Sequence, residues 1–195
     1  MKYGAVILYG GKSRRMGRDK AELIIEGQTF LEHIAGELEN FEELILSLDN
    51  LEKYPEIKHT AVTDIYPDCG PMGGIHAALS ACDSDALLVV SCDLPLFKGE
   101  LGEYLCAQLD EEIDAVVPVT SDGRMHPLCA VYRKTASQVF EKYLIAENYK
   151  ILNAYKDMRV KYIPMDHTPC SGKWLQNINT PQEYDALCGR KERHI

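Results

Sequence analysis

The chain has 195 residues, of which 46% are hydrophobic and 26% charged, and its formal net charge is −9. This length suits one compact domain or two small ones, and the composition supplies a hydrophobic core of ordinary size. The negative charge argues against a general nucleic-acid binder, which needs a basic face to neutralise phosphates, but it allows a small anionic substrate in a locally basic pocket.

The sequence also indicates where the protein works. No stretch approaches the roughly 20 apolar residues that span a bilayer, so we expect no membrane association. The N-terminal apolar run is too short for a signal peptide, and no small-residue cleavage site follows it. The seven cysteines are odd in number and contain no C-x-x-C pair. We therefore expect reduced thiols in a cytoplasmic protein, and neither a disulfide framework nor a structural zinc site.

Strand-like and helix-like segments alternate over the first 110 residues. The continuous apolar run Tyr3–Tyr9 predicts a strand buried on both faces. A helix follows over residues 29–40, with Thr29 as its N-cap and Glu32 three positions later. Further strands are predicted over 42–48, 59–63 and 86–93, and further helices over 71–82 and 98–111. This alternation implies βαβ units and a mainly parallel sheet with helices on both faces.

The pattern changes in the second half of the chain. Predicted strands over 114–119 and 127–133 flank the turn-containing segment TSDGRMH, without a helix between them. We therefore expect an antiparallel element or a small inserted subdomain in the region 120–165. The remaining predicted elements are a helix over 134–148, a strand over 160–165, a short strand near Asn177, and a last helix that begins at Pro181.

A strongly basic loop, GGKSRRMGRDKA, follows the first predicted strand. It is not a Walker loop, which would need a glycine at the position of Val6, and it lacks the spaced glycines of a dinucleotide-binding loop. Its place after a buried parallel strand still favours phosphate binding over a merely solvated basic loop. The candidate phosphate ligands are the backbone of Gly10 and Gly11, the Ser13 hydroxyl, and the side chains of Arg14, Arg15, Arg18 and Lys20.

Acidic residues follow two other predicted strands. Asp93 ends the clearest buried strand, so it lies at the same edge as the basic loop and suits Mg²⁺, which takes few carboxylates plus phosphate oxygens. The alternative is an ordinary turn or N-cap aspartate. Asp64 ends the third strand, and Gly73 and Gly74 open the helix after it, where a ligand can approach closely. Simple turn chemistry explains these glycines equally well.

The C-terminal half offers fewer candidates. Asn177 and Asn179 alternate along the predicted short strand, so a regular strand would point them to opposite faces. Asn179 could cap the last helix or add an oxygen ligand to a metal. Arg159 is a candidate anion contact for a second substrate, as are Arg133 and Lys161, and the lone His126 is expected to be structural or on the surface.

These segments resemble the molybdenum cofactor guanylyltransferases of the nucleotidyltransferase superfamily. The motifs LYGGKSRRMGRDKAEL, DCGPMGGI, SCDLPLF, HPLCAVY and NINTPQEY carry the resemblance over nearly the whole chain. It implies a three-layer α/β/α, Rossmann-like fold related to glycosyltransferase A, as a single domain over 1–195. Residues 1–110 would form the nucleotide-binding half and residues 111–195 the acceptor half.

The implied reaction transfers GMP from GTP to the terminal phosphate of molybdenum-molybdopterin and releases pyrophosphate. The alternatives are a sibling enzyme that uses CTP on the same pterin, or one that loads a nucleotide onto a sugar phosphate. The implied partners are GTP and molybdenum-molybdopterin, with molybdoenzyme chaperones or other cofactor-biosynthesis proteins as further candidates. The implied cofactor is Mg²⁺.

The resemblance also assigns roles by position. Tyr9 stands where the family usually has alanine, beside the base, and Asp49 where it often has asparagine. Lys20, Arg15 and Asp93 would be catalytic, with Asp93 as the metal ligand, and Asn177, Asn179 and Arg159 would serve the acceptor. The implied nucleotide site comprises Leu8, Tyr9, Gly10, Gly11, Ser13, Arg15, Gly17, Lys20, Asp49, Asp64, Gly74 and Asp93.

Overall fold

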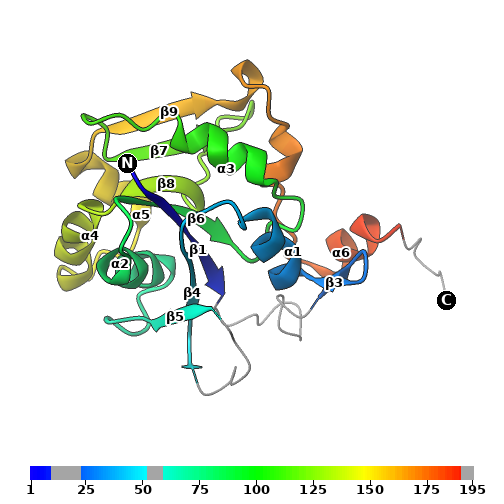
Figure 1. Cartoon of the computed structure of the whole chain (residues 1–195), viewed down its shortest axis with the longest axis horizontal. Helices are drawn as coiled ribbons and strands as arrows, with labels where there is room; N and C mark the ends of the chain where they lie inside the picture. The colour runs from blue at the N-terminus through cyan, green and yellow to red at the C-terminus, as the bar shows by residue number, and fades with distance from the viewer. Residues whose placement is uncertain (10–22, 52–58, 190–195) are drawn as a thin grey trace.

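A computed structural model describes residues 1–9, 23–51 and 59–189. In this part of the chain a seven-stranded sheet, of order β5-β4-β1-β6-β8-β7-β9, forms the centre of the molecule (Figure 1). A separate two-stranded sheet joins β2 to β3. The strands are β1 (Tyr3–Tyr9), β2 (Ile24–Ile25), β3 (Gln28–Thr29), β4 (Leu44–Leu48), β5 (Thr60–Thr63), β6 (Ala86–Ser91), β7 (Ala115–Val119), β8 (Cys129–Arg133) and β9 (Val160–Pro164).

Strand direction defines two distinct edges of the large sheet. β1 pairs in parallel with β4 and β6, β4 with β5, and β7 with β9, whereas β8 runs antiparallel to β6 and β7. The carboxyl ends of every strand except β8 therefore share one edge, and β8 starts there. This arrangement confirms the predicted mainly parallel sheet and places the expected antiparallel element at β8.

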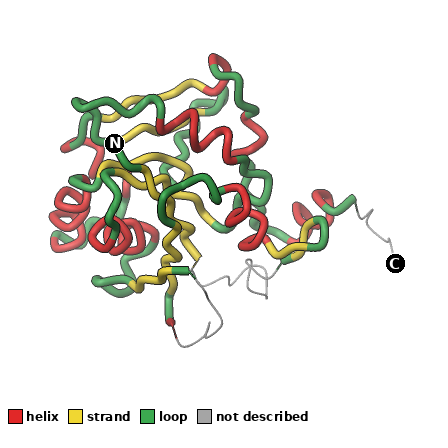
Figure 2. Tube along the Cα trace, in the orientation of Figure 1, coloured by secondary structure: helices red, strands yellow, loops and turns green. Residues whose placement is uncertain are grey.

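Helices cover both faces of the sheet (Figure 2). Alternate residues of β1 pack into two separate clusters, with Ala5 and Ile7 facing α1 and α3, and Val6 and Leu8 facing α2, α4 and α5. The strand thus lies in the middle of a three-layer structure. The helices are α1 (Phe30–Glu37), α2 (Pro71–Ala81), α3 (Gly99–Cys106), α4 (Ala136–Ile145), α5 (Ile151–Ala154) and α6 (Pro181–Leu187), and the 3-10 helices are η3 (Tyr155–Asp157), η4 (Met165–His167) and η5 (Gly172–Leu175).

The ends of α1 and α6 follow directly from their sequences. Thr29 caps α1 and exchanges hydrogen bonds with Glu32, as predicted, and Thr180 and Glu183 form the same capping box at α6. Thr180, and not Asn179, is therefore the cap of the last helix. A further difference is that α3 ends at Cys106, short of the predicted 111.

The segment before α6 corrects another prediction. Residues 176–179 form no strand. Instead the Ile178 N–H donates to the Asp93 carbonyl at 2.9 Å, and the Ile178 side chain packs with Leu23 and Phe30. The Tyr184 hydroxyl donates to the Ile24 carbonyl at 2.8 Å, which ties α6 to the β2–β3 hairpin (Figure 1). The hairpin was not predicted, because two-residue strands carry no readable periodicity.

Two further sequence expectations concern the thiols and the membrane. All seven cysteines lie in described segments and carry free thiols. Burial raises the pKa of the Cys106 thiol to about 12, so this thiol is not a nucleophile. Among the described residues there is no helix with the length and apolar character that crossing a membrane requires.

A pair of buried tyrosines joins β8 to the helical layer over it. The Tyr132 hydroxyl lies 2.8 Å from the Pro127 carbonyl oxygen and 2.6 Å from the Tyr155 hydroxyl. A carbonyl oxygen only accepts, so Tyr132 gives its single proton to Pro127, and Tyr155 must donate to Tyr132. The two hydroxyls are therefore not equivalent, although they share one hydrogen bond.

This asymmetry predicts different costs for the two phenylalanine variants. Tyr155→Phe removes one donor and should lower the free energy of unfolding by about 1 kcal/mol. Tyr132→Phe leaves both the Pro127 carbonyl and the Tyr155 hydroxyl without that partner, so its cost should be about twice as large. Urea unfolding measures both losses, and an equal or larger loss for Tyr155→Phe would contradict the assigned directions.

Candidate functional site

The carboxyl edge of the sheet gathers most of the predicted site residues that the structure describes. β1 ends at Tyr9, Asp49 follows β4, Asp64 follows β5, and Asp93 lies two residues beyond β6. Parallel pairing of these four strands brings all four positions to one edge. The predicted phosphate ligands Gly10, Gly11, Ser13, Arg15, Gly17 and Lys20 lie outside the described residues.

The start of α2 packs tightly against this edge. A Cβ atom added to Gly74 would lie 2.5 Å from Ser47 Oγ and 3.4 Å from Leu8 Cδ2, and one added to Gly73 would lie 2.8 Å from Asp64 Oδ2. Gly70, which precedes the helix, has a φ of 64°. These glycines therefore allow the positive end of the helix to lie directly over the ends of β1, β4 and β5, where an anion would be stabilised.

Asp64 has an unusual environment at this point. Burial, and then the charge of Asp68, raises the pKa of the Asp64 carboxyl to about 6. Its carboxylate faces the start of α2 beside Gly73. A carboxyl group that exchanges its proton near neutral pH can act as a hydrogen-bond donor or acceptor toward a ligand.

Asp93 is held from the C-terminal segment. The Asn177 Nδ2 atom donates to Asp93 Oδ2 at 3.1 Å, and the neighbouring Ile178 N–H donates to the Asp93 main-chain carbonyl at 2.9 Å. Both Asp93 and Asn177 are partly buried. The structure thus joins two predicted site residues that are 84 positions apart in the sequence, and it orients the carboxylate with a neutral donor.

Tyr9 is buried at the end of β1, and its predicted place beside the base stays a prediction. Its side chain is only 5% exposed and belongs to the core cluster beneath α1 and α3. Leu8, its neighbour, faces α2 on the other side of the sheet. The Tyr9 ring therefore does not lie beside Leu8 on the α2 side, because successive side chains of a strand point to opposite faces.

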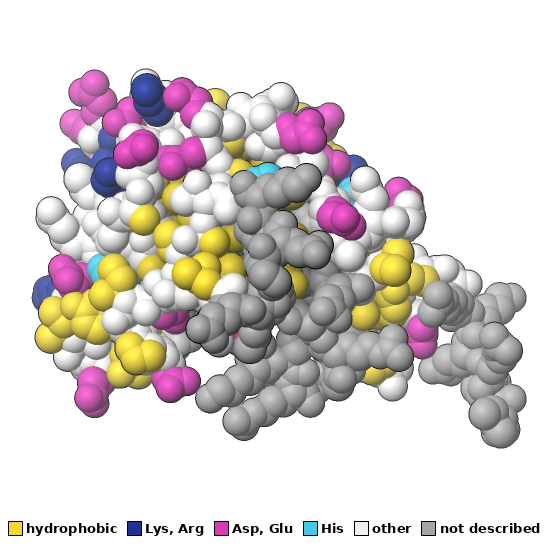
Figure 3. Space-filling model, turned by 60° about the horizontal axis from the view of Figure 1, so that its bottom comes forward, with side chains coloured by type: hydrophobic (Ala, Val, Ile, Leu, Met, Phe, Trp, Pro, Cys, Tyr) yellow, Lys and Arg dark blue, Asp and Glu magenta, His cyan; other side chains and the backbone are white. Residues whose placement is uncertain are grey.

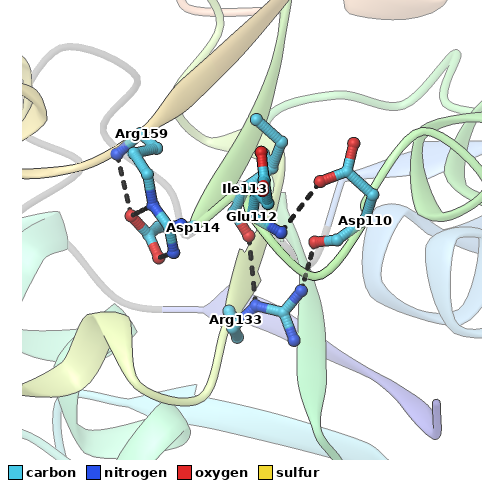
Figure 4. A network of polar contacts seen from close by, with 6 residues as sticks. All are labelled: Asp110, Glu112, Ile113, Asp114, Arg133 and Arg159. Atoms are coloured by element: carbon cyan, nitrogen blue, oxygen red, sulfur yellow. Dashed lines mark hydrogen bonds and ion pairs between the residues drawn. The ribbon is translucent and has the colours of Figure 1, made fainter.

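Arg159 is not brought to the carboxyl edge. It precedes β9, and its guanidinium lies 2.9 Å from Asp114 Oδ1 at the opposite edge of the sheet (Figure 4). Arg133, at the end of the antiparallel β8, joins the same network through the Ile113 and Asp110 carbonyls. Both arginines therefore lie at the amino edge of the sheet, and the role of Arg159 toward the acceptor stays a prediction.

Sequence reasoning missed two features of the site. One is Ser47, a buried hydroxyl in an otherwise apolar strand, which a polar residue inside LILSL could have signalled. The other is the hairpin of residues 120–128, which lies at the carboxyl edge because it joins the end of β7 to the start of β8. The direction of β7 and β8 was needed to place it.

The close contact at Gly74 predicts a specific effect on stability. Gly74→Ala should lower the free energy of unfolding by about 1–3 kcal/mol, because the added methyl group overlaps the Ser47 hydroxyl. Gly36→Ala is the matched control, because nothing lies within 4 Å of the added methyl group there, and it should be neutral or stabilise by up to about 1 kcal/mol. Chemical denaturation of the two variants tests this difference.

A double variant identifies the cause of the loss. Ser47→Ala removes the overlapping oxygen, so the variant with both Ser47→Ala and Gly74→Ala should recover most of the stability lost by Gly74→Ala alone. Strictly additive losses would show that the overlap is not the source.

The raised pKa of Asp64 predicts a pH-dependent difference in stability. The folded state favours the protonated carboxyl, so this contribution is present below about pH 4 and is lost as pH rises through about 6. Asp64→Asn cannot ionise. Relative to the wild type, its free energy of unfolding should therefore rise by about 1 kcal/mol between pH 4 and pH 7, a value reduced for partial solvent screening. A difference that does not change with pH would contradict the assignment.

Comparisons with known proteins agree with this geometry. The family model for the MobA-like NTP transferase domain matches residues 5–160. A probable molybdenum cofactor guanylyltransferase of Clostridium perfringens is 37% identical over 98% of this chain and 99% of its own length, and one of Carboxydothermus hydrogenoformans is 34% identical over 93% and 92%. Molybdopterin-guanine dinucleotide biosynthesis protein A of Archaeoglobus fulgidus shares the fold, with a TM-score of 0.84, 24% identity and 97% coverage of both chains. The chain therefore belongs to the MobA-like NTP transferase family.

Proposed function

We propose that this nucleotidyltransferase transfers GMP from GTP to the terminal phosphate of molybdenum-molybdopterin and releases pyrophosphate. The observation that carries the proposal is the position of Asp93, in the middle of the carboxyl edge and oriented by Asn177. The start of α2 lies on one side of it, and the end of β7, the start of β8 and the end of β9 lie on the other. The names of the relatives from Clostridium perfringens and Carboxydothermus hydrogenoformans supply the guanine nucleotide and the molybdenum cofactor.

This division suggests where the two substrates bind. The nucleotide lies over β1, β4 and the start of α2. Its proposed contacts among the described residues are Leu8, Asp49, Asp64 and Gly74. The acceptor approaches from the side of β7 and β8, near Asn177. In this proposal residues 1–110 form the nucleotide half and residues 111–195 the acceptor half, and the enzyme works in the cytoplasm.

The residues at Asp93 suit a divalent metal ion such as Mg²⁺. Mg²⁺ is commonly held by one or two carboxylates plus substrate phosphate oxygens and waters. No group of three or more His, Cys, Asp or Glu side chains that could hold a metal occurs in the described ranges. A single carboxylate fixed by a neutral amide matches a metal that the nucleotide helps to bind. When bound, the ion would offset negative charge on the triphosphate.

The chemical step needs no strong base from the protein. An oxygen of the acceptor phosphate attacks the α-phosphorus of GTP in line, a new P–O bond forms, and the bond to the β-phosphate breaks so that pyrophosphate leaves. A phosphate dianion is already a nucleophile at pH 7. The protein therefore contributes positioning and neutralisation of charge, for which we propose Arg15 and Lys20 of the basic loop.

The charge distribution is compatible with two polyanionic substrates. The chain carries a net charge of −9, and acidic side chains lie around the face that Figure 3 brings forward. The sequence concentrates arginine and lysine in residues 12–20. A basic loop on an acidic protein attracts anions locally while the rest of the surface disfavours non-specific binding of polyanions.

Pyrophosphate release with GTP, Mg²⁺ and molybdenum-molybdopterin tests the proposal. The wild type should turn over with GTP and not with CTP, and Asp93→Asn should lower kcat by about 100-fold or more because the carboxylate charge is lost. Asp83→Asn, which changes an exposed aspartate just before β6 at the opposite edge, is the matched control and should keep normal activity.

Three other outcomes would contradict parts of the proposal. Preference for CTP would replace the guanine assignment, and turnover with a sugar phosphate in place of the pterin would overturn the acceptor. Near-normal activity of Asp93→Asn, with the fold intact by circular dichroism, would remove Asp93 from the metal site.

A further inference from the structure

The hairpin of residues 120–128 faces the same edge as Asp93, on the acceptor side. Its ends are fixed by main-chain hydrogen bonds, from Ser91 N–H to the Leu128 carbonyl at 2.8 Å and from His126 N–H to the Pro118 carbonyl at 3.0 Å. Ser91 is the last residue of β6, two positions before Asp93. The end of the hairpin at Leu128 therefore lies beside the last residue of β6, two positions before the proposed metal ligand.

A second segment connects the hairpin to Asp93. A Cβ atom added to Gly172 would lie 3.9 Å from Thr120 Cγ2, and Asn177, five residues later, donates to Asp93. Five residues span at most about 18 Å when fully extended, and η5 shortens this segment. One short segment of the chain, from Gly172 to Asn177, thus connects the hairpin to Asp93 on the acceptor side.

The imidazole of His126 is fixed within this hairpin. Its Nε2 atom lies 3.1 Å from Thr120 Oγ1, and the Thr120 hydroxyl lies 2.6 Å from Asp122 Oδ1. The hydrogen bond from Thr120 holds the pKa of Asp122 below its usual range, so this carboxylate is an ionised acceptor. Thr120 therefore gives its proton to Asp122, and the proton between Thr120 and His126 belongs to Nε2.

The other nitrogen of His126 is left for a ligand. Within the described residues Nδ1 has no hydrogen-bond partner, and it is not among the fully enclosed polar atoms, unlike Nδ1 of His76. Burial, and then the charge of Arg124, lowers the pKa of His126 despite the nearby Asp122, so the ring is neutral at pH 7. With Nε2 protonated, Nδ1 carries a lone pair and accepts hydrogen bonds.

We infer that His126 binds the heterocyclic ring of the acceptor, with Nδ1 accepting a hydrogen bond from a pterin N–H group. This inference rests on the proposed function. A phosphate dianion offers only acceptor oxygens, so the lone pair of Nδ1 does not bind the form of the acceptor phosphate that attacks GTP. The nucleotide lies on the other side of Asp93, over β1 and β4. A pterin presents ring and amino N–H donors, which match the one free polar atom of this imidazole.

Two substitutions separate ligand binding from a structural role. His126→Gln reaches the position of Nε2, so it keeps a hydrogen bond to Thr120 but loses the acceptor at Nδ1. His126→Asn keeps an acceptor near Nδ1 and loses the bond to Thr120. We expect His126→Gln to raise KM for molybdenum-molybdopterin by about tenfold, with KM for GTP unchanged, and His126→Asn to have the smaller effect.

The opposite ranking would overturn the inference, because a histidine that only holds the hairpin would be replaced better by glutamine. Inhibition supplies an independent measurement. A pterin without the phosphorylated side chain should inhibit the wild type and should inhibit His126→Gln about tenfold less strongly, whereas inorganic phosphate should inhibit both equally. If inorganic phosphate inhibited His126→Gln less strongly than the wild type, and the pterin inhibited both equally, His126 would bind the phosphate and the assignment to the ring would be refuted.

The activity of the wild type separates a failure of the proposed function from a failure of the role proposed for His126. If the wild type releases no pyrophosphate with molybdenum-molybdopterin, the proposed function fails and the inference fails with it. If the wild type is active and both KM values of His126→Gln match those of the wild type, only the role of His126 is refuted. Thermal unfolding of both variants shows whether either substitution disturbs the fold.

Discussion

The burial of β1 between β4 and β6 is the constraint on which the rest of the structure depends. Residues 4–9 are buried, and the register pairs Leu8 with both Ser47 and Ser91. Because apolar side chains on both faces contact separate helical layers, a shift by one residue would exchange the two layers and is strongly disfavoured. The ends of three strands are thereby fixed in one row. The polar residues that follow them are brought together by hydrophobic packing that involves none of them.

The C-terminal segment completes this edge, although it adds little to the central core. Ile178 packs in a small cluster with Leu23 and Phe30, and this cluster also anchors the hairpin β2–β3. Asn177 and the Ile178 backbone hold Asp93 from the same segment. The orientation of the carboxylate therefore depends on a satellite cluster, so local opening of α6 can affect the site before the main sheet is disturbed.

The sequence predicts helices and strands where these depend on the periodicity of apolar residues. It does not predict the direction of a strand in the sheet or the face to which each side chain of a buried strand points. The alternation of apolar runs and helical patterns is visible from β1 to α3, and it led to the correct layers. The position of Arg159 at the amino edge could not be predicted, because the pattern of a strand does not tell which of its ends lies at which edge of the sheet. The burial of Tyr9 on the side of α1 and α3 could not be predicted, because a strand that is apolar on both faces does not show which side each residue faces. The Asn177–Asp93 contact spans 84 residues and joins an irregular segment, which local pattern cannot reveal.

The two edges of the sheet differ in the charged side chains that the described residues place there. At the amino edge Arg159 is paired with Asp114, and Arg133 is held by main-chain carbonyls (Figure 4). At the carboxyl edge the described residues contribute carboxylates, from Asp49, Asp64 and Asp93. Carboxylates gathered this way repel an anionic substrate, and burial followed by the charge of Asp68 raises the pKa of Asp64. If the triphosphate binds at this edge as proposed, positive charge must accompany it, and the proposed roles of the basic loop and of a divalent metal ion share this physical basis.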